Sequence, residues 1–306
     1  QTGHRNGACC HGRHPVGSDT NYTMSRNRPV FPLVRRTRGT TAVALLVAAA
    51  ASWLVSACAT TPEPLAGGCA SNSAPLALAR GPELSDELEV LSWNIQKASN
   101  NGWAEDLAEL SGGINLAFIQ EASIQAAIPA VMDKPLHQTF VPGYTTAELA
   151  TGVMTLSSSA PSMSCDFTSW EPWLGTPKAT SVTEFSLANR GDRLLAINLH
   201  AVNFALGVAD FQRQFDALRE VLGNHRGPII LAGDLNTWSD ERRTLVTNFM
   251  EQYDLTPVAF TPDLRTRYFG QALDHLYVRG MRAESARVIP VSTSDHNPLR
   301  VRLVLN

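Results

Sequence analysis

The stretch at residues 229–237, with the sequence IILAGDLNT, constrains the fold of this chain more than any other. Its first four residues form an uninterrupted apolar run, which is typical of a buried strand. The run ends at Gly233, and Asp234 and Asn236 follow on alternate positions. Side chains on a strand alternate between its faces, so these two polar side chains should point the same way. Asp and Asn also cap ordinary turns, so the meaning of the pair depends on partners elsewhere in the chain.

Partners of matching chemistry occur at the ends of other predicted strands. Further strands are predicted at residues 88–95, 116–121, 152–156, 181–187, 194–201, 273–278 and 299–305. Polar groups lie near the ends of these strands or in the last loop, namely Asn94, Glu121, His200, Asp274, Asp295 and His296. The strands of a parallel or mixed sheet deliver such groups to one crevice, so we expect them to converge. Taken singly, Glu121 could instead serve the N-terminus of a following helix, and a lone His on a strand is more often a packed core residue.

Helical spacing of apolar residues predicts helices between these strands. They are expected at residues 103–110, 123–132 and 208–225, and from Ser239 to about Tyr253. Ser239 precedes two acidic residues, which is a typical helix start. The turn at residues 189–192 predicts a hairpin. No internal repeat or second break in composition is present, so we expect one domain at residues 88–306.

The expected cluster of polar groups favours metal-assisted chemistry on a phosphate ester. Several carboxylates and imidazoles in one crevice would repel one another without a cation among them. Oxygen-rich ligands favour Mg²⁺, Mn²⁺ or Ca²⁺, and the chain has no HExxH motif or cysteine spacing of the kind that a zinc hydrolase needs. Mg²⁺ shares phosphate oxygens with its substrates and promotes attack by water. The formal net charge of -3 provides no basic face for bulk DNA binding.

The first part of the chain resembles an export signal. Residues 1–23 have no periodic apolar pattern, and we expect them to be a non-native extension upstream of a true start at Met24. An arginine-rich segment then precedes an apolar run at residues 41–55, which is too short for a comfortable membrane span of about 20 residues. The run closes with Val-Ser-Ala-Cys, which resembles a bacterial lipobox ending at Cys58. We therefore expect a signal peptide at residues 24–58 and a lipidated Cys58. A short buried helix is the alternative.

The segment that follows has the composition of a tether. Residues 59–87 are rich in Ala, Pro, Ser and Gly and show no alternation, which predicts a flexible link between a membrane anchor and a domain. Cys69 and Cys165 would be the remaining thiols after export, and they could pair in an oxidising compartment. The sequence leaves that pairing open.

Six short motifs, in this order along the chain, resemble the endonuclease/exonuclease/phosphatase family with the DNase-I-like fold. They are Trp93-Asn94, Gln120-Glu121, Asn198-Leu199-His200, Gly233-Asp234-Leu235-Asn236, Leu273-Asp274-His275 and Ser294-Asp295-His296. The stretches 151–157, 200–204 and 294–298 are similar to the YafD-like bacterial branch of that family. The resemblance covers residues 88–305. It implies a four-layer α/β/β/α sandwich of two packed mixed β-sheets flanked by helices.

The resemblance also implies a role for each matching residue. Glu121 would bind the metal, with Asn94 and Asp295 close to it, and Asn94 would lie near the substrate phosphate. Asp234 would orient or deprotonate the attacking water, and Asn236 would hold a phosphate oxygen. His296 would contact the phosphate or act as base, oriented by Asp274. His200 would stabilise developing charge or protonate the leaving oxygen.

Three further positions bear on the site. The family often has a second acid just after the first Asn motif, but this chain has Gln96 there, which puts a two-carboxylate ligand set in doubt. Lys178 is a candidate phosphate contact, although a surface lysine is the simpler interpretation. Asn203 is a candidate for the lining of the same pocket, and here too a surface residue is the simpler interpretation.

The leading hypothesis is a divalent-metal-dependent phosphoesterase that uses Mg²⁺, Mn²⁺ or Ca²⁺. We expect an exported, monomeric lipoprotein that lipidated Cys58 anchors at the periplasmic or extracellular face of a bacterial membrane. The substrate stays open between nucleic acid, a nucleotide and a lipid headgroup. The alternative is a non-catalytic binding lipoprotein on the same fold, because fold alone does not determine function.

Overall fold

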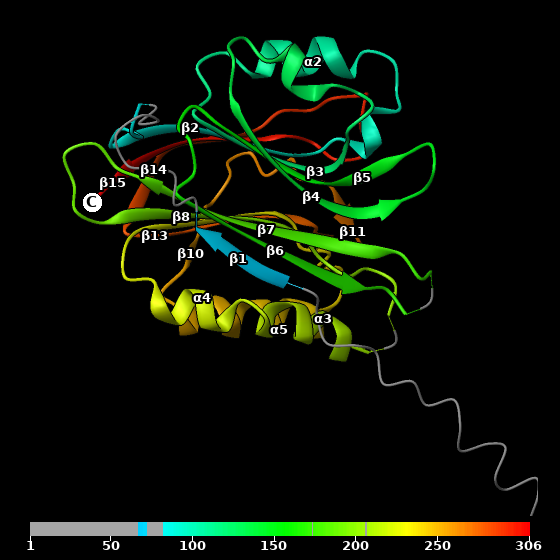
Figure 1. The fold of residues 1–306 in the computed structure, drawn as a ribbon. Helices are drawn as coiled ribbons and strands as arrows, with labels where there is room; N and C mark the ends of the chain where they lie inside the picture. The colour runs from blue at the N-terminus through cyan, green and yellow to red at the C-terminus, as the bar shows by residue number, and fades with distance from the viewer. Residues whose placement is uncertain (1–66, 72–81, 173, 206) are drawn as a thin grey trace, which may run out of the picture. The chain divides into compact units, whose positions relative to one another are not determined.

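Two mixed β-sheets lie face to face in the computed structural model, which describes residues 67–71, 82–172, 174–205 and 207–306 (Figure 1). The seven-stranded sheet has the order β1-β6-β7-β8-β9-β13-β10, and the six-stranded sheet has the order β14-β15-β2-β3-β5-β4. The first contains β1 Gly67–Ser71, β6 Met163–Trp170, β7 Pro177–Ser186, β8 Arg193–His200, β9 Ile229–Asp234, β10 Thr256–Pro257 and β13 Asp274–Arg279. The second contains β2 Glu87–Asn94, β3 Leu116–Ser123, β4 His137–Thr145, β5 Ala150–Ser157, β14 Met281–Val288 and β15 Leu299–Leu305. A small hairpin joins β11 Arg267–Tyr268 to β12 Gln271–Ala272.

Helices cover the outer face of each sheet, which confirms the expected four-layer sandwich (Figure 1). Helix α2, Trp103–Leu110, packs on the six-stranded sheet through buried Leu107 and Leu110. The outer face of the other sheet carries α3 Ala209–Asp216, α4 Arg219–Asn224 and α5 Asp240–Gln252. Two single-turn 3₁₀ helices, Gln96–Ala98 and Ile128–Val131, lie in the connections.

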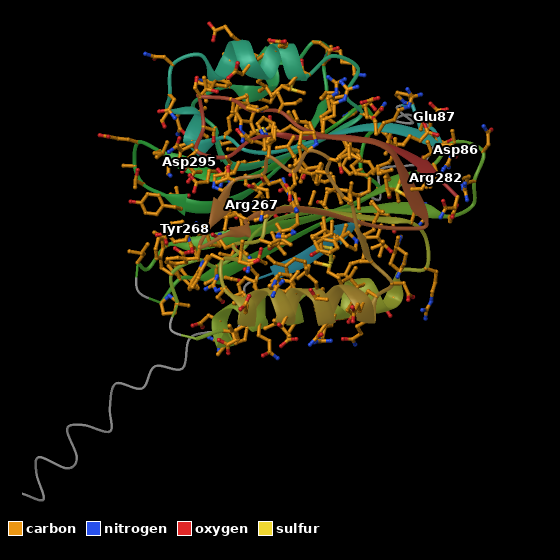
Figure 2. The ribbon with its side chains drawn as sticks, turned by 180° about the vertical axis from the view of Figure 1, so that it is seen from behind. Asp86, Glu87, Arg267, Tyr268, Arg282 and Asp295 are labelled. Atoms are coloured by element: carbon orange, nitrogen blue, oxygen red, sulfur yellow. A yellow bond between two sulfur atoms is a disulfide. The ribbon has the colours of Figure 1, made fainter. Side chains whose placement is uncertain are left out.

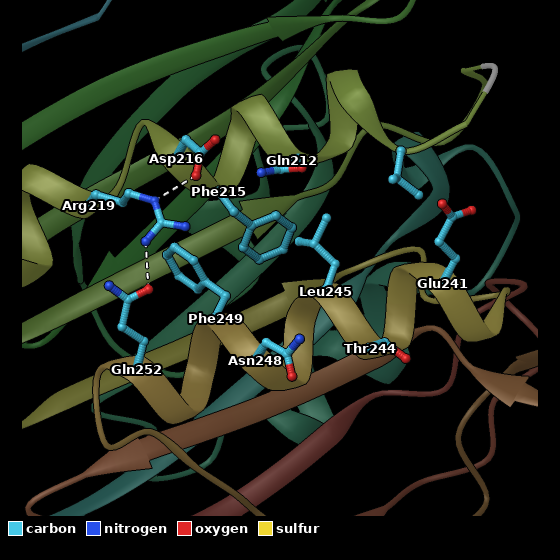
Figure 3. A pocket seen from close by; sticks show the side chains of 11 residues that line it. Gln212, Phe215, Asp216, Arg219, Glu241, Thr244, Leu245, Asn248, Phe249 and Gln252 are labelled. Atoms are coloured by element: carbon cyan, nitrogen blue, oxygen red, sulfur yellow. Dashed lines mark hydrogen bonds and ion pairs between the residues drawn. The ribbon is translucent and has the colours of Figure 1, made fainter.

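Aromatic side chains hold α3 and α5 together where they line a shallow pocket (Figure 3). The rings of Phe215 and Phe249 meet edge to face with centroids 5.2 Å apart. Arg219 closes one end of this contact, since its guanidinium donates to Asp216 and to Gln252, each at 2.6 Å. The exposed ion pair adds little by itself, so the packed rings supply most of the stabilisation.

Alternation along the central strands divides the apolar residues between an inner and two outer cores. Leu88 and Val90 pack in the core between the sheets, whereas Leu91 and Trp93 pack under α2. The other sheet follows the same rule. Its inner core contains Leu194, Ala196, Ile230 and Ala232, and the core under α3 to α5 contains Leu195, Ile197, Ile229 and Leu231. Even-numbered positions of β2, β8 and β9 therefore face the space between the sheets.

A buried amide pair marks the point where the inner core turns polar. Gln120 Nε2 donates to Asn198 Oδ1 at 2.7 Å, and Asn198 Nδ2 donates to the Met154 carbonyl at 3.0 Å. Both amides are fully buried and come from different sheets, so they join the two layers beyond the last apolar pair. The candidate site residues follow directly, since Glu121 comes after Gln120 on β3 and His200 lies two residues after Asn198 at the end of β8.

Several predicted elements are confirmed and others are wrong at their boundaries. Helices α2 and α5 begin where predicted, and the Ser239 hydroxyl accepts from the Arg242 amide at 3.3 Å as a cap. The helix predicted at residues 208–225 is divided, because the Leu218 amide bonds to Phe215 in a tighter turn. The helix predicted at residues 123–132 is wrong. Strand β3 runs to Ser123, and only the 3₁₀ turn at Ile128–Val131 follows.

Strands β4, β6 and β14 were not predicted, and each has weak apolar alternation; β1 and the two-residue strands β10, β11 and β12 were not predicted either. Strand β4 is the edge of the six-stranded sheet, and most of its side chains are exposed or half-buried. Strand β6 lies beside β1 near the edge of the other sheet and buries only two of its eight side chains. A strand with few buried positions has little apolar periodicity in its sequence.

The segment at residues 59–87 differs from an uninterrupted tether. Strand β1 pairs antiparallel with β6, and the Cys69–Cys165 disulfide joins the two at directly opposite positions. Leu84 is buried against Leu187, and β2 already begins at Glu87. The open question about the two cysteines is thus settled in favour of a bond.

The predicted signal peptide and Cys58 lie outside the described residues. The chain divides into the units Gln1–Thr61 and Pro62–Asn306, and every element above belongs to the second unit. No helix within the described ranges is long and apolar enough to cross a membrane.

The inner core predicts a large loss of stability on truncation of Phe118, which is fully buried between the sheets. We expect Phe118→Ala to lower the free energy of unfolding by about 3–5 kcal/mol, because it leaves a cavity that two sheets cannot close. Ile124→Ala is the control, since Ile124 is 42% exposed, and it should cost less than about 1 kcal/mol. Urea titrations of both variants measure the difference. Equal losses would contradict this description of the core.

Candidate active site

The site begins where three adjacent strands of the seven-stranded sheet meet at Asp234. In the strand register, His200 at the end of β8 and Asp274 at the start of β13 both lie opposite Asp234 at the end of β9. Asn94, at the end of β2 in the other sheet, donates from Nδ2 to Asp234 Oδ2 at 3.1 Å. Polar residues predicted on separate strands therefore converge between the two sheets.

Gly233 allows this convergence. Its φ of 145° lies outside the range that residues with a side chain commonly adopt, and a Cβ there would lie 2.0 Å from the Leu199 carbonyl oxygen. Only glycine lets β8 and β9 approach this closely, so the position directly before Asp234 has a structural requirement of its own.

The ring of His296 lies between the buried carboxylates of Asp274 and Asp234. Its Nδ1 lies 2.8 Å from Asp274 Oδ2, and its Nε2 lies 3.8 Å from Asp234 Oδ2. Burial opposes the charged ring, but Asp274 and Asp234 together raise the pKa of His296 to about 10. Burial raises the pKa of Asp234 to about 6, against the opposing effect of His296. At neutral pH the cluster is a buried imidazolium held by two acids.

The loop that carries His296 is fixed to the end of β2. Ser294 Oγ donates to the Asn94 carbonyl at 2.7 Å and accepts from the His296 amide at 3.1 Å. The indole of buried Trp93 donates to the His296 carbonyl at 3.0 Å. These three bonds orient the histidine before any ligand binds.

His200 has the opposite electrostatic environment. Its Nε2 lies 3.0 Å from Lys178 Nζ, 3.6 Å from Asp234 Oδ2 and 4.0 Å from Glu121 Oε1. Burial, reinforced by the charge of Lys178, holds the pKa of His200 well below its usual value. The ring is therefore neutral, and its Nε2 accepts a hydrogen bond from the Lys178 ammonium. Two histidines of one cluster thus have different charges.

Glu171 was missed by the sequence analysis, although it organises this side of the site. It is 1% exposed, and its carboxylate lies 3.8 Å from Lys178 Nζ. It also accepts from the amides of Asn203 at 2.7 Å and Phe204 at 3.3 Å, and from Thr176 Oγ1 at 2.6 Å. The only signal in the sequence is an acid between two tryptophans at residues 170–173, which reads as a plain connection.

Asn236 and Asn203 are held by protein contacts rather than free in a pocket. Asn236 adopts a left-handed backbone with φ of 48°, its amide donates to Asp234 Oδ1 at 3.0 Å, and its Nδ2 donates to the Ala201 carbonyl at 3.0 Å. Asn203 Oδ1 accepts from the Trp238 indole at 2.8 Å. Both amides therefore brace the loops around Asp234 and His200.

Arg242 is a second residue that the sequence analysis missed. It is 1% exposed and lies between the rings of Phe211 and Trp238, 4.6 Å from each centroid. Its guanidinium donates to the carbonyls of Val202 at 2.6 Å, Asn203 at 2.7 Å and Asn236 at 3.3 Å. A surface arginine in the first turn of a helix would look the same in the sequence.

Glu121 lies at the opening of the site, where the backbone is unusual. Its own φ is 50°, and the three residues of the Gln96–Ala98 turn have φ values of 49°, 63° and 55°. Lys97 in that turn lies with its Nζ 2.5 Å from Glu121 Oε2. Left-handed conformations cost free energy for residues other than glycine and concentrate at functional sites. Lys97 thus partners Glu121, close to the position where the family often has an acid.

Asp295 is exposed and lies at the same end of the sandwich as Arg267 and Tyr268, far from Asp86 and Arg282 at the other end (Figure 2). Its carbonyl accepts from Thr266 Oγ1 at 2.9 Å, and its charge contributes to the raised pKa of His296. Among the described residues, no side chain links the Asp295 carboxylate to that of Glu121. A shared ligand role for the two stays a prediction.

The donor atoms of the site fit a divalent cation that prefers oxygen. Ligand atoms of Asp234, Asp274 and His296 all lie within 4.8 Å of one another. The positive charge of His296 already offsets the negative charge of Asp234 and Asp274, so a metal ion bound by these three groups would have to replace the proton of His296. Glu121 is more accessible, with 20% of its side chain exposed, and it needs only to release Lys97. A cation could therefore reach the Glu121 carboxylate without displacing the proton of His296.

The raised pKa of His296 predicts how stability depends on pH. The group contributes its full stabilisation below pH 6.5 and loses it as the pH rises towards 10, because the folded state holds the proton more tightly. Between pH 7 and pH 10 we expect the free energy of unfolding to fall by about 2 kcal/mol or more relative to Asp274→Asn. Urea titrations along this pH range measure it, with exposed Asp192→Asn as control. Parallel curves for wild type and Asp274→Asn would contradict the charged pair.

Comparison with known sequences identifies relatives over most of the described domain. A UPF0294 protein of Vibrio vulnificus is 38% identical over 220 residues, which are 71% of this chain and 77% of the relative. A UPF0294 protein of Vibrio cholerae is 36% identical over 275 residues, which are 85% of this chain and 96% of the relative. These relatives support the resemblance to the YafD-like branch.

Solved structures with the same fold are more distant in sequence. The human Nocturnin catalytic domain with bound sulfate has a TM-score of 0.54 at 16% identity, covering 74% of this chain and 98% of that one. The mannosyl-6-phosphatase Bt3783 of Bacteroides thetaiotaomicron has a TM-score of 0.54 at 18% identity, covering 71% of this chain and all of that one. The similarity confirms the DNase-I-like sandwich.

The family model described as the endonuclease/exonuclease/phosphatase family matches residues 91–296, which include all six motifs. Members of this family typically hydrolyse phosphate esters, such as those of nucleic acids, and commonly use divalent metals. The match covers most of the chain and contains every candidate site residue, so this chain belongs to the endonuclease/exonuclease/phosphatase family.

Proposed function

We propose that this protein is a divalent-metal-dependent phosphoesterase that uses activated water to hydrolyse a phosphate ester. The observation that carries the proposal is a pair of histidines that differ in charge and both lie close to Asp234 Oδ2. His296 is an imidazolium held by Asp274, and His200 is neutral beside Lys178. Groups with divergent proton affinities around one acid are typical of acid–base chemistry.

Each residue has a task that its environment supports. Asp234, with a pKa of about 6, is deprotonated at neutral pH and can orient or deprotonate the attacking water. The charged His296 can bind a phosphate oxygen, and Asp274 holds its ring in place. Lys178 can stabilise negative charge that develops on the phosphate, and His200, which lies beside it, would be close to the leaving oxygen.

A bound Mg²⁺ or Mn²⁺ would supply further positive charge for the phosphate and the developing oxyanion. Glu121 is its proposed ligand, with Asn94 and Asp295 nearby. Ca²⁺ is the less suitable ion, since it takes more oxygen ligands than this set provides.

The cellular setting is part of the proposal. A lipidated Cys58 would anchor the enzyme to a bacterial membrane at its periplasmic or extracellular face, and the protein would act as a monomer. The Cys69–Cys165 disulfide supports export, because such bonds persist in oxidising compartments. Nucleic acids, nucleotides and lipid headgroups remain the candidate substrates, and the mannosyl-6-phosphatase with this fold adds small phosphomonoesters.

Removal of either central group should abolish turnover. We expect Asp234→Asn and His296→Gln to lower kcat by about 10²- to 10⁴-fold on bis(4-nitrophenyl) phosphate or 4-nitrophenyl phosphate, because each removes a proton-transfer or charge-stabilising group. EDTA should abolish the activity and Mg²⁺ or Mn²⁺ should restore it.

The matched controls are Asp192→Asn and His137→Gln, both at exposed positions, and they should keep wild-type activity. Activity that resists EDTA, or that survives in both central variants, would refute the proposed mechanism. Absence of turnover together with absence of metal binding by calorimetry would favour a binding lipoprotein instead.

Glu171 should act as a positioning residue for Lys178. Glu171→Gln keeps the acceptors for the amides of Asn203 and Phe204 but removes the charge that faces the ammonium. We expect kcat to fall about tenfold, which corresponds to about 1.4 kcal/mol, with the thermal midpoint nearly unchanged. Glu184→Gln is the control, since Glu184 pairs with Arg193 away from the site. An equal kcat in Glu171→Gln and wild type would show that the pair has no catalytic role.

A further inference from the structure

A pocket of about 290 Å³ opens beside the candidate site, and its two ends differ in chemistry. Its inner end is lined by the buried and half-buried groups Glu121, Lys178 and His200, and the more exposed Lys97, which pairs with Glu121, also lines the pocket. Its outer end is lined by Tyr144, Leu174 and Phe204, which come from β4, from the connection between β6 and β7, and from the loop after β8. Three segments that are distant in sequence therefore bring apolar side chains to one opening.

These three side chains are unusually exposed for their type. Tyr144 is 41%, Leu174 57% and Phe204 53% accessible to solvent. Single exposed apolar residues are normal on a protein surface, but a group that lines one pocket next to a polar site indicates a ligand with an apolar part.

The outer end offers few free hydrogen-bonding groups. Thr176 Oγ1 donates to Glu171, and Thr151 Oγ1 donates to the Tyr144 carbonyl. Two of the three hydroxyls that line the pocket thus direct their protons into the protein, and the third is the phenol of Tyr144. The outer end can bind an apolar group by burial of surface, and among its three side chains the Tyr144 hydroxyl is the group that could bond to a polar one.

The loop positions are fixed by the same residue that positions the inner end. Glu171 binds the amide of Phe204 and the hydroxyl of Thr176, and it also faces Lys178. The buried carboxylate of Glu171 therefore fixes the spacing between Lys178 and the loop that carries Phe204 at the outer end of the pocket. A ligand that spans both ends meets a preformed site.

We propose that this pocket is a specificity subsite for an apolar group esterified to the phosphate, so that the preferred substrate is an amphiphilic phosphate ester. The inference rests on the proposed function, because it assigns the phosphate end of the ligand to Lys178 and His200. The volume is at the small end of the range for small-molecule sites, about 300–1,000 Å³, so one ring or a short alkyl group fits rather than a polymer. The group is selected by burial against Tyr144, Leu174 and Phe204.

Binding of non-hydrolysable phosphonates to the full-length protein tests this subsite without turnover. Calorimetry in Mg²⁺ compares methylphosphonate, phenylphosphonate and hexylphosphonate. We expect phenylphosphonate or hexylphosphonate to bind at least about tenfold more tightly than methylphosphonate, because each buries apolar surface that the methyl compound lacks. The stronger of the two identifies the source of the apolar group, a ring as in a nucleobase or a chain as in a lipid.

Substitutions at the rim provide the second measurement. The double variant Leu174→Ser/Phe204→Ser should bind phenylphosphonate or hexylphosphonate less than about threefold more tightly than methylphosphonate. Both side chains are exposed, so we expect the variant to fold normally. Phe269→Ser is the control, since Phe269 is 77% exposed and does not line the pocket, and it should keep the preference. Equal affinities of the three phosphonates for the wild type, no binding of any of them, or a preference that persists in the double variant would each overturn the proposal.

Hydrolysis of ethyl phosphate and phenyl phosphate by the wild type separates this proposal from the proposed function. Turnover of both with equal kcat/KM would leave the phosphoesterase intact and overturn the subsite. A clear phosphonate preference without turnover of either ester would support the subsite and contradict the enzyme.

Discussion

The ion pair between His296 and Asp274, with Asp234 on the other side of the ring, is the interaction on which the rest of the site depends. Two carboxylates buried side by side would not both ionise without a cation between them. Removal of one member of such a buried set typically costs about 3–5 kcal/mol, because the remaining charge has no partner. The bonds from Ser294 and Trp93 to the His296 loop keep the cation in place. The loop before β15 thereby joins β2 of one sheet to the centre of the other sheet.

The position of this cluster follows from the same alternation that builds the core. Even-numbered residues of β2, β8, β9 and β13 face the space between the sheets, apolar in the middle and polar at one end. The Gln120–Asn198 pair lies at the transition and joins the sheets there. The apolar core fixes the strand register, and the register places Asn94, His200 and Asp234 within reach of one another. Function at this site therefore depends on packing that lies well away from it.

The sequence was sufficient to predict what periodicity and motif order determine. The sandwich, the strand carrying Asp234 and the convergence of His200, Asp274 and His296 were all predicted, because each depends on local alternation or on a motif. Glu171 and Arg242 were not, since their roles arise from contacts between segments 30 or more residues apart in sequence, such as Glu171 with Asn203 and Arg242 with Val202. Strands β4 and β6 were missed because each buries too few side chains to show a period. The contact of Lys97 with Glu121 depends on a left-handed turn that no residue type in the sequence indicates.

The site is a preformed acid–imidazole cluster with Glu121 at its opening and a neutral histidine, a lysine and exposed apolar side chains beside it. The most direct test of the proposed metal-dependent chemistry is a crystal structure grown with Mn²⁺ and inorganic phosphate, with anomalous data collected to locate the manganese. We expect an anomalous peak at the Glu121 carboxylate, Lys97 displaced from it, and phosphate in contact with His296 and Lys178. A peak elsewhere, or manganese between Asp234 and Asp274 with His296 driven out, would contradict it.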